Sequence, residues 1–135
     1  MSITFKLLIV SAILVSCLAD KCGGNCLSAE CPECTCGNTP NYVTIEHICS
    51  KLSWNQSCCK CVLSRENGGN ANAIKYTPKR NYDLGLFMIN HFFWLTHQCE
   101  GHPCEPEANA KCAFEAYKDK KSFSWMQSAA GCGCT

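Results

Sequence analysis

Cysteine content constrains this chain more than any other feature of its sequence. The chain has 135 residues and 15 cysteines, a proportion typical of short exported proteins that disulfides hold together. Cys17 lies in an apolar N-terminal segment, and the number of the others is even, so all of them can pair. We therefore expect an exported, disulfide-rich domain in which these cysteines are oxidised: Cys22, Cys26, Cys31, Cys34, Cys36, Cys49, Cys58, Cys59, Cys61, Cys99, Cys104, Cys112, Cys132 and Cys134.

Residues 1–19 are interpreted as a signal peptide. Lys6 precedes the apolar run 7–15, and the small residue Ala19 stands where cleavage would fall. The four residues that end at Cys17 also resemble a bacterial lipoprotein cleavage box, which would make that cysteine a lipid anchor. Both interpretations imply export. No other stretch approaches the roughly 20 apolar residues that a membrane span needs, so we expect no membrane span.

Charge and size exclude several classes of protein. Without Lys6, the chain carries 11 basic and 11 acidic residues, so it has no basic field for nucleic acid. The 116 residues that follow Ala19 are enough for one core, and an apolar fraction of 47% is too high for intrinsic disorder. We divide this part of the chain into a cysteine-rich segment, 20–40, and a main domain, 41–135.

The cysteine spacing in segment 20–40 is C-x3-C-x4-C-x2-C-x-C, which indicates irregular chain held by cross-links. The C-P-E-C and C-T-C spacings also suit metal ligands, as do His97 and His102, each two residues before a cysteine. Disulfides are the preferred interpretation because the compartment is oxidising. We therefore expect no metal and no cofactor.

Apolar periodicity predicts two helices in the first half of the main domain. Residues 42–52 form a nearly helical apolar stripe. A second helix is expected to begin near Asn55 or Ser57, both good N-cap residues, and to end near Glu66, because two glycines follow. Glu66 then falls on the buried stripe, an unusual place for a glutamate. The alternative is a last-turn residue that tilts toward solvent.

A small antiparallel sheet is expected around a turn at residues 76–81. Pro106 suits the first turn of a helix that runs to about Tyr117. Helices with one small sheet define the α+β class. Core positions are expected for the small residues of that last helix and for several aromatic residues: Ala108, Cys112, Ala113, Ala116, Trp54, Phe92, Phe93, Phe123, Trp125 and Met126.

Two neighbouring segments together resemble the lysozyme superfamily. Residues 65–73 read R-E-N-G-G-N-A-N-A, and residues 82–90 read Y-D-L-G-L-F-M-I-N. Lysozymes place a glutamate at a helix end before an S/G-x-N-x-x-A stretch, and a D-x-G-[LI]-[FW]-Q-I-N motif follows. The seventeen residues from Glu66 to Asp83 match the spacing in c-type lysozymes. The resemblance covers roughly residues 41–134 and is greatest to small, cysteine-rich, secreted lysozyme-like proteins of unicellular eukaryotes.

This resemblance implies a lysozyme-like α+β fold and cleavage of peptidoglycan between N-acetylmuramic acid and N-acetylglucosamine. Glu66 would be the catalytic acid and Asp83 the second carboxylate. Glycosidic cleavage needs a proton donor and a negative charge near the oxocarbenium-like sugar. Burial should raise the pKa of Glu66, while a polar site should keep Asp83 ionised. The resemblance places further residues at the substrate: Asn70, Gly85, Asn90 and Trp94.

Some of these residues have other interpretations. Asp83 and Asn90 are also suited to bonding nearby backbone, and Trp94 is suited equally to the core and to a sugar-lined cleft. Met88 departs from the family, which commonly has glutamine there. Asn55 begins a glycosylation acceptor, Asn-Gln-Ser.

Three other functions stay open at this point. They are a lytic transglycosylase that uses Glu66 alone, a non-catalytic glycan-binding protein, and an inhibitor or toxin if the cysteine-rich segment is its own module. The preferred expectation is a monomeric, antibacterial or digestive enzyme, either secreted or in a phagosomal or lysosomal lumen, with peptidoglycan as its partner.

The adjacent cysteines Cys58 and Cys59 are expected to have different partners. Neighbouring side chains on a helix point about 100° apart, so the two sulfurs cannot reach the same region. We expect one to bind the N-terminal cysteine-rich segment and the other the later half of the chain.

Overall fold

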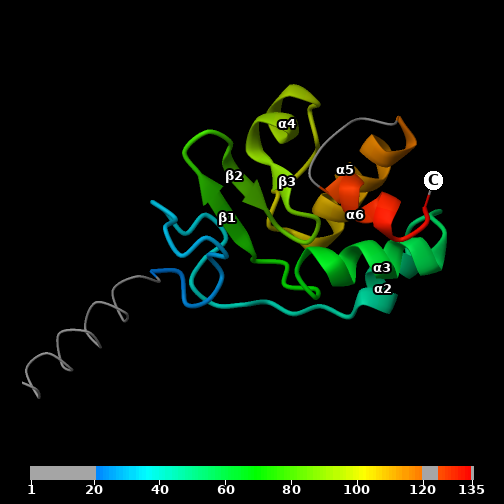
Figure 1. Ribbon diagram of the computed structural model, residues 1–135, viewed down its shortest axis with the longest axis horizontal. Coiled ribbons are helices and arrows are strands. Elements are labelled where there is room, and N and C mark those ends of the chain that lie inside the picture. Colours follow the sequence, from blue (N-terminus) through cyan, green and yellow to red (C-terminus); the bar gives the residue numbers. More distant parts are fainter. Residues whose placement is uncertain (1–20, 120–124, 135) are drawn as a thin grey trace, which may run out of the picture.

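A computed structural model describes residues 21–119 and 125–134. The expected signal peptide, Phe123, and the side chains of Trp125 and Met126 lie outside what it describes. This part of the chain contains helices and one small sheet, as expected for an α+β domain (Figure 1). The helices are α2 (Ile45–Ser50), α3 (Gln56–Glu66), α4 (His91–Thr96), α5 (Pro106–Lys118) and α6 (Trp125–Gly131); the strands are β1 (Ile74–Thr77), β2 (Asn81–Leu84) and β3 (Ile89–Asn90).

Helix α3 begins and ends where the sequence predicts. The Asn55 side chain accepts a hydrogen bond from the backbone N–H of Cys58 at 2.9 Å, so it is the N-cap. Val62 and Leu63 are fully buried. This helix is therefore anchored by its apolar stripe, and its last residue is Glu66.

Helix α2 is shorter than the predicted 42–52. Its first predicted residues are extended instead, because Val43 N–H bonds to the Gly69 carbonyl at 3.0 Å and Tyr42 forms a β-bridge with Asn70. Pairing with the loop that follows α3 thus replaces the first helical turn. Helix α5 agrees with the prediction, although Ala108 is only partly buried.

The sheet is antiparallel, with the order β1-β2-β3. The predicted turn joins β1 to β2, and Asp83 lies opposite Lys75 on one side and Asn90 on the other. The cysteine-rich segment packs on this sheet, because Leu27 N–H and the Asn25 carbonyl both bond to Ile74 at 2.7 Å. Backbone hydrogen bonds thus join the cysteine-rich segment to the edge strand β1.

Seven disulfides link all the cysteines expected to pair, which confirms the disulfide-rich class. The two adjacent cysteines have different partners, as predicted, and Cys58 pairs with Cys134 in the later half of the chain. The prediction that the other one binds segment 20–40 was wrong. Cys59 pairs with Cys49 of α2, which packs beside α3, and the link from segment 20–40 is made by Cys36–Cys104. Because Cys99 and Cys104 are oxidised, they offer no thiolate to a metal. The pairs are Cys22–Cys34, Cys26–Cys31, Cys36–Cys104, Cys49–Cys59, Cys58–Cys134, Cys61–Cys132 and Cys99–Cys112.

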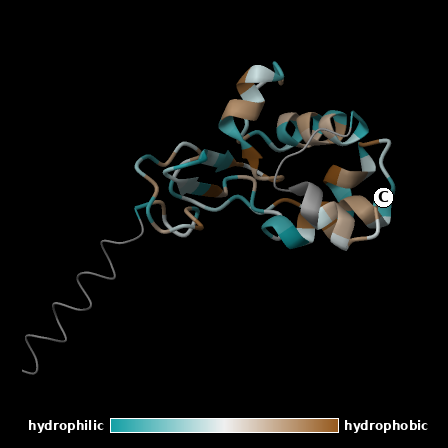
Figure 2. Cartoon of the chain, turned by 45° about the horizontal axis from the view of Figure 1, so that its top comes forward, coloured by the Kyte–Doolittle hydropathy of each residue, from teal (hydrophilic) through white to brown (hydrophobic). Residues whose placement is uncertain are grey.

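Aromatic side chains divide between the core and the surface. Trp54 is 5% exposed and stacks on Phe87, as predicted. Phe93 is partly buried and stacks on His97. Phe92 was wrongly predicted as core: it is 55% exposed, because on the short helix α4 the inward positions go to its neighbours. Coloured by hydropathy, the helices contain both apolar and polar residues (Figure 2).

Within residues 21–119 and 125–134, no helix is long and apolar enough to cross a membrane.

Candidate active site

Glu66 is the last residue of α3 and is partly buried. Its Oε1 accepts a hydrogen bond from Ser128 Oγ at 2.8 Å. Burial raises the pKa of this carboxyl above its ordinary value, and the negative charge of Asp83 adds to the increase. The hydrogen bond from Ser128 and the positive charge of Lys75 act in the opposite direction. Glu66 therefore holds its proton more tightly than an exposed glutamate does.

Asp83 lies in the middle of the sheet and is 5% exposed. Its Oδ1 accepts a hydrogen bond from Asn90 Nδ2 at 3.1 Å and lies 3.7 Å from Arg80 Nη2. These donors compensate for the loss of water around a carboxylate. The buried carboxylate of Asp83 is thus surrounded by polar groups, although the next residue of the strand, Leu84, is apolar and fully buried.

The fold brings Glu66 and Asp83 within range of each other's charge, since Asp83 raises the pKa of Glu66. Lys75 is the cross-strand partner of Asp83 and also acts on Glu66. The end of α3 and this face of the sheet therefore present two carboxylates in unlike surroundings. Such a pair can supply a proton and a negative charge to one substrate.

The Asn90 side chain makes three hydrogen bonds. Its Nδ2 donates to Asp83 and, at 2.8 Å, to the Arg80 carbonyl. Its Oδ1 accepts the Phe92 N–H at 3.0 Å, which makes it the N-cap of α4. The structure therefore places Asn90 beside Asp83, where it orients the carboxylate and starts the next helix.

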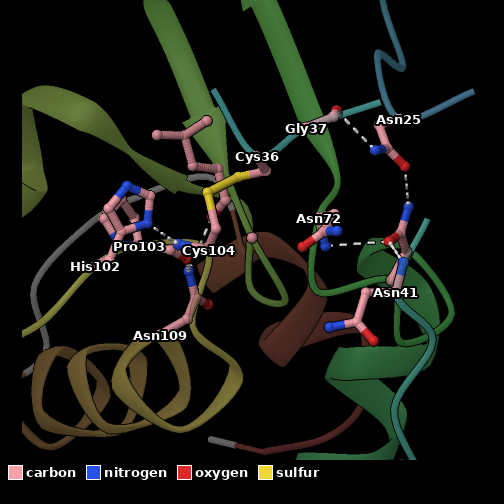
Figure 3. The surroundings of a disulfide bond; sticks show 12 residues. Asn25, Cys36, Gly37, Asn41, Asn72, His102, Pro103, Cys104 and Asn109 are labelled. Atoms are coloured by element: carbon pink, nitrogen blue, oxygen red, sulfur yellow. Dashed lines mark hydrogen bonds between the residues drawn. A yellow bond between two sulfur atoms is a disulfide. The ribbon is translucent and has the colours of Figure 1, made fainter. Parts of the chain in front are cut away.

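Asn70 and Gly85, which the resemblance places at the substrate, are buried in packing. Asn70 is 4% exposed, and its Oδ1 accepts the N–H groups of Asn41 at 2.9 Å and Asn72 at 3.1 Å. Its Nδ2 donates to Asn25 Oδ1 at 3.3 Å. Asn25, Asn41 and Asn72 are labelled in Figure 3. A Cβ on Gly85 would lie 2.3 Å from the Pro103 carbonyl oxygen. Both residues shape the loops around the carboxylates.

Trp94 is 5% exposed and belongs to the helical core. Asn55, the first residue of the glycosylation acceptor, is exposed at the start of α3.

Asn67 is a site residue that sequence reasoning missed. Its Nδ2 is shared between the carbonyls of Gly85 and Leu86, at 3.0 and 3.1 Å, and its Oδ1 accepts the Asn70 N–H at 3.0 Å. It ties the end of α3 to the turn that follows β2, and so holds Glu66 against the sheet. An asparagine directly after a predicted helix end, before Gly-Gly, was the available signal.

Asn109 of α5 was also missed and is fully buried. Its Nδ2 donates to the Leu84 carbonyl at 2.9 Å and to the Pro103 carbonyl at 2.7 Å, and its Oδ1 accepts the Phe87 N–H at 2.8 Å. Asn109 and Pro103 are labelled near the Cys36–Cys104 disulfide in Figure 3. Asn109 thereby fixes the chain just after Asp83.

Comparisons of the chain with models of protein families, with curated proteins and with solved structures find no match. In the part of the chain that the structure describes, no three His, Cys, Asp or Glu side chains are grouped as a metal site would require. The function must therefore be inferred from the two carboxylates and from the sequence resemblance.

Proposed function

We propose that this protein is a muramidase, which hydrolyses the bond between N-acetylmuramic acid and N-acetylglucosamine in peptidoglycan. The observation that carries the proposal is a pair of unlike carboxylates. Partly buried Glu66, whose pKa is raised, lies within range of the charge of Asp83, which is buried among hydrogen-bond donors. The lysozyme-like motifs around both residues support the same assignment.

In this mechanism Glu66 donates its proton to the glycosidic oxygen as the bond breaks. General acid catalysis of this kind is typically worth about 10² to 10⁴ in rate. Asp83 stabilises the positive charge that develops on the sugar, or attacks it, and Glu66 then takes a proton from the incoming water. The protonated state of Glu66 is required first, so its raised pKa suits the role.

The proposed location is the outside of the cell or a phagosomal or lysosomal lumen. Seven disulfides require an oxidising compartment to form and persist. Peptidoglycan from bacteria outside the cell, or taken up by it, is accessible in both places.

A lytic transglycosylase is the second candidate, and the surroundings of Asp83 favour it. The side chain of Asp83 is 8% exposed, and the same oxygen is held by Asn90 and faces Arg80. An oxygen bound in this way is a poor nucleophile. A mechanism that uses Glu66 as the only reacting group would instead close an anhydro-sugar without water.

The test is incubation of the purified protein with bacterial peptidoglycan, followed by turbidity and by mass spectrometry of the products. A muramidase releases reducing muropeptides that have gained one water per bond cleaved. Products lighter by that one water would identify the transglycosylase instead. Sedimentation with peptidoglycan without any released fragment would identify a glycan-binding protein and overturn the proposal.

A further inference from the structure

The C-terminal helix α6 supplies a hydroxyl group to the carboxyl at the end of α3. Ser128 Oγ donates to Oε1 of Glu66 at 2.8 Å, across 62 positions of sequence. Both side chains are partly buried, and a hydrogen bond to an ionised oxygen is stronger where water is scarce. This contact therefore restrains the orientation of the carboxyl group.

Covalent bonds hold the serine in this place. Cys61–Cys132 and Cys58–Cys134 both join α3 to the residues that directly follow α6. In Figure 1, α6 lies along α3, and the two helices are in contact. Gly131 lies against the Arg65 side chain of α3, whose guanidinium end can move. Two disulfides, together with the packing of the short helix α6, therefore hold Ser128 near Glu66.

We propose that Ser128 is a positioning residue that keeps Oε1 of Glu66 as a hydrogen-bond acceptor, so that Oε2 carries and delivers the proton. The inference rests on the proposed hydrolase function. A neutral carboxyl has one protonated oxygen and one acceptor oxygen. With Ser128 as the donor to Oε1, a proton on that oxygen would face the serine hydrogen, so in this arrangement the proton resides on Oε2.

The hydrogen bond from Ser128 also stabilises the Glu66 carboxylate after the proton has left. The proton moves from Oε2 to the glycosidic oxygen, and the carboxylate that remains accepts a stronger bond from Ser128. Among the described residues, the other charges that act on Glu66 are Asp83 on β2, which favours the protonated form, and Lys75 on β1, which favours the ionised form. The hydrogen bond from Ser128 lowers the pKa of Glu66, whereas burial and the charge of Asp83 raise it. Removal of the hydroxyl group should therefore raise the pKa of Glu66.

The experiment compares Ser128→Ala with Ser128→Thr, which keeps a hydroxyl, and with Ser64→Ala on the exposed side of α3. The kcat and KM of the whole protein are measured on soluble peptidoglycan fragments across pH, and the Glu66 carboxyl is titrated by NMR. We expect kcat of the alanine variant to fall roughly ten-fold or more with little change in KM. Its activity should persist to higher pH, and Ser128→Thr and Ser64→Ala should resemble the wild type.

Two results would overturn the inference. The first is a Ser128→Ala variant with the wild-type kcat and pH profile. The second is an equal loss at every pH with an unchanged Glu66 titration, which is what a merely structural serine produces. Failure of the proposed function can be distinguished from both results. In that case the wild-type protein would release no peptidoglycan fragments, and the NMR titration of Glu66 would still test the contact with Ser128.

Discussion

The two carboxylates of the candidate site differ because of their immediate neighbours. Glu66 is partly buried and accepts one bond from a neutral hydroxyl, so the loss of water dominates and raises its pKa. Asp83 is more deeply buried, but an amide and a guanidinium face it. Acid catalysis with charge stabilisation requires two carboxyl groups in unlike surroundings of this kind.

Substitution Glu66→Gln should abolish hydrolysis of peptidoglycan. Glutamine has nearly the same shape but no acidic proton, so the fold and glycan binding should remain nearly intact. The measurement is the rate of turbidity loss, with sedimentation on peptidoglycan as the control for binding. Retention of more than about a tenth of the wild-type rate would exclude Glu66 as the general acid, given the usual contribution of about 10² or more.

The same variant should change the pH dependence of stability. The pKa of Glu66 in the folded protein lies above its ordinary value of 4.5, so folding favours the protonated form. The wild-type protein is therefore stabilised as the pH falls through this raised pKa toward 4.5, and the contribution is lost as the pH rises. Relative to wild type, Glu66→Gln should be more stable at neutral pH than at pH 4 in urea unfolding. An equal difference at both pH values would contradict a raised pKa.

At the scale of elements, the turn between β2 and β3 connects the sheet to two helices. Asn67 at the end of α3 bonds to the Gly85 and Leu86 carbonyls, and Asn109 of α5 bonds to the Leu84 carbonyl. Two asparagines from different helices thus satisfy the backbone groups of one buried turn. This arrangement sets the position of Asp83 relative to the end of α3.

Gly85→Ala should destabilise this turn more than Gly68→Ala destabilises the nearby loop. Both glycines have positive φ, +78° and +70°, so both alanines bear a strain of about 1–2 kcal/mol. Only at Gly85 would the new Cβ meet Pro103 and Asn109, at 2.3 and 2.4 Å, whereas nothing lies within 4 Å at Gly68. The clash should add about 1–3 kcal/mol to the loss in free energy of unfolding, measured with urea. Equal losses would show that the turn can relax.

At the scale of the whole molecule, disulfides join parts that share few apolar contacts. The helical core and the smaller cluster between the sheet and the cysteine-rich segment are separate groups of buried residues. Cys36–Cys104 joins the cysteine-rich segment to the chain before α5 (Figure 3). A short chain can hold two small cores in this way because cross-links limit the unfolded state.

Loss of Cys36–Cys104 should cost more stability than loss of Cys26–Cys31. Cys36–Cys104 joins residues with a sequence separation of 68, and Cys26–Cys31 joins residues with a sequence separation of 5. Loop-closure entropy predicts losses of about 4 and about 2 kcal/mol in the free energy of unfolding. Paired cysteine-to-serine variants and urea unfolding measure both, with activity retained as the check on folding. The reverse order would show that strain or residual structure outweighs loop length.

Local signals in the sequence were sufficient for most of the elements. The capping asparagine at Asn55, the glycines after Glu66 and Pro106 at a first helical turn all act on neighbouring residues. The same is true of the turn at residues 76–81, which joins two paired strands. The even cysteine number likewise predicted oxidation, because pairing depends on the count and on the compartment.

Only the tertiary structure decided the contacts between distant parts of the chain. Nothing in the sequence near Ser128 indicates that it contacts Glu66. The two disulfides that bring α6 to α3 pair cysteines that are far apart in the sequence, at separations of 76 and 71. The partner of Cys59 and the exposure of Phe92 depend in the same way on which helix faces which. Sequence identifies a residue's chemistry and its local backbone, whereas burial and partners belong to the packed molecule, since they arise from residues that the chain brings together only on folding.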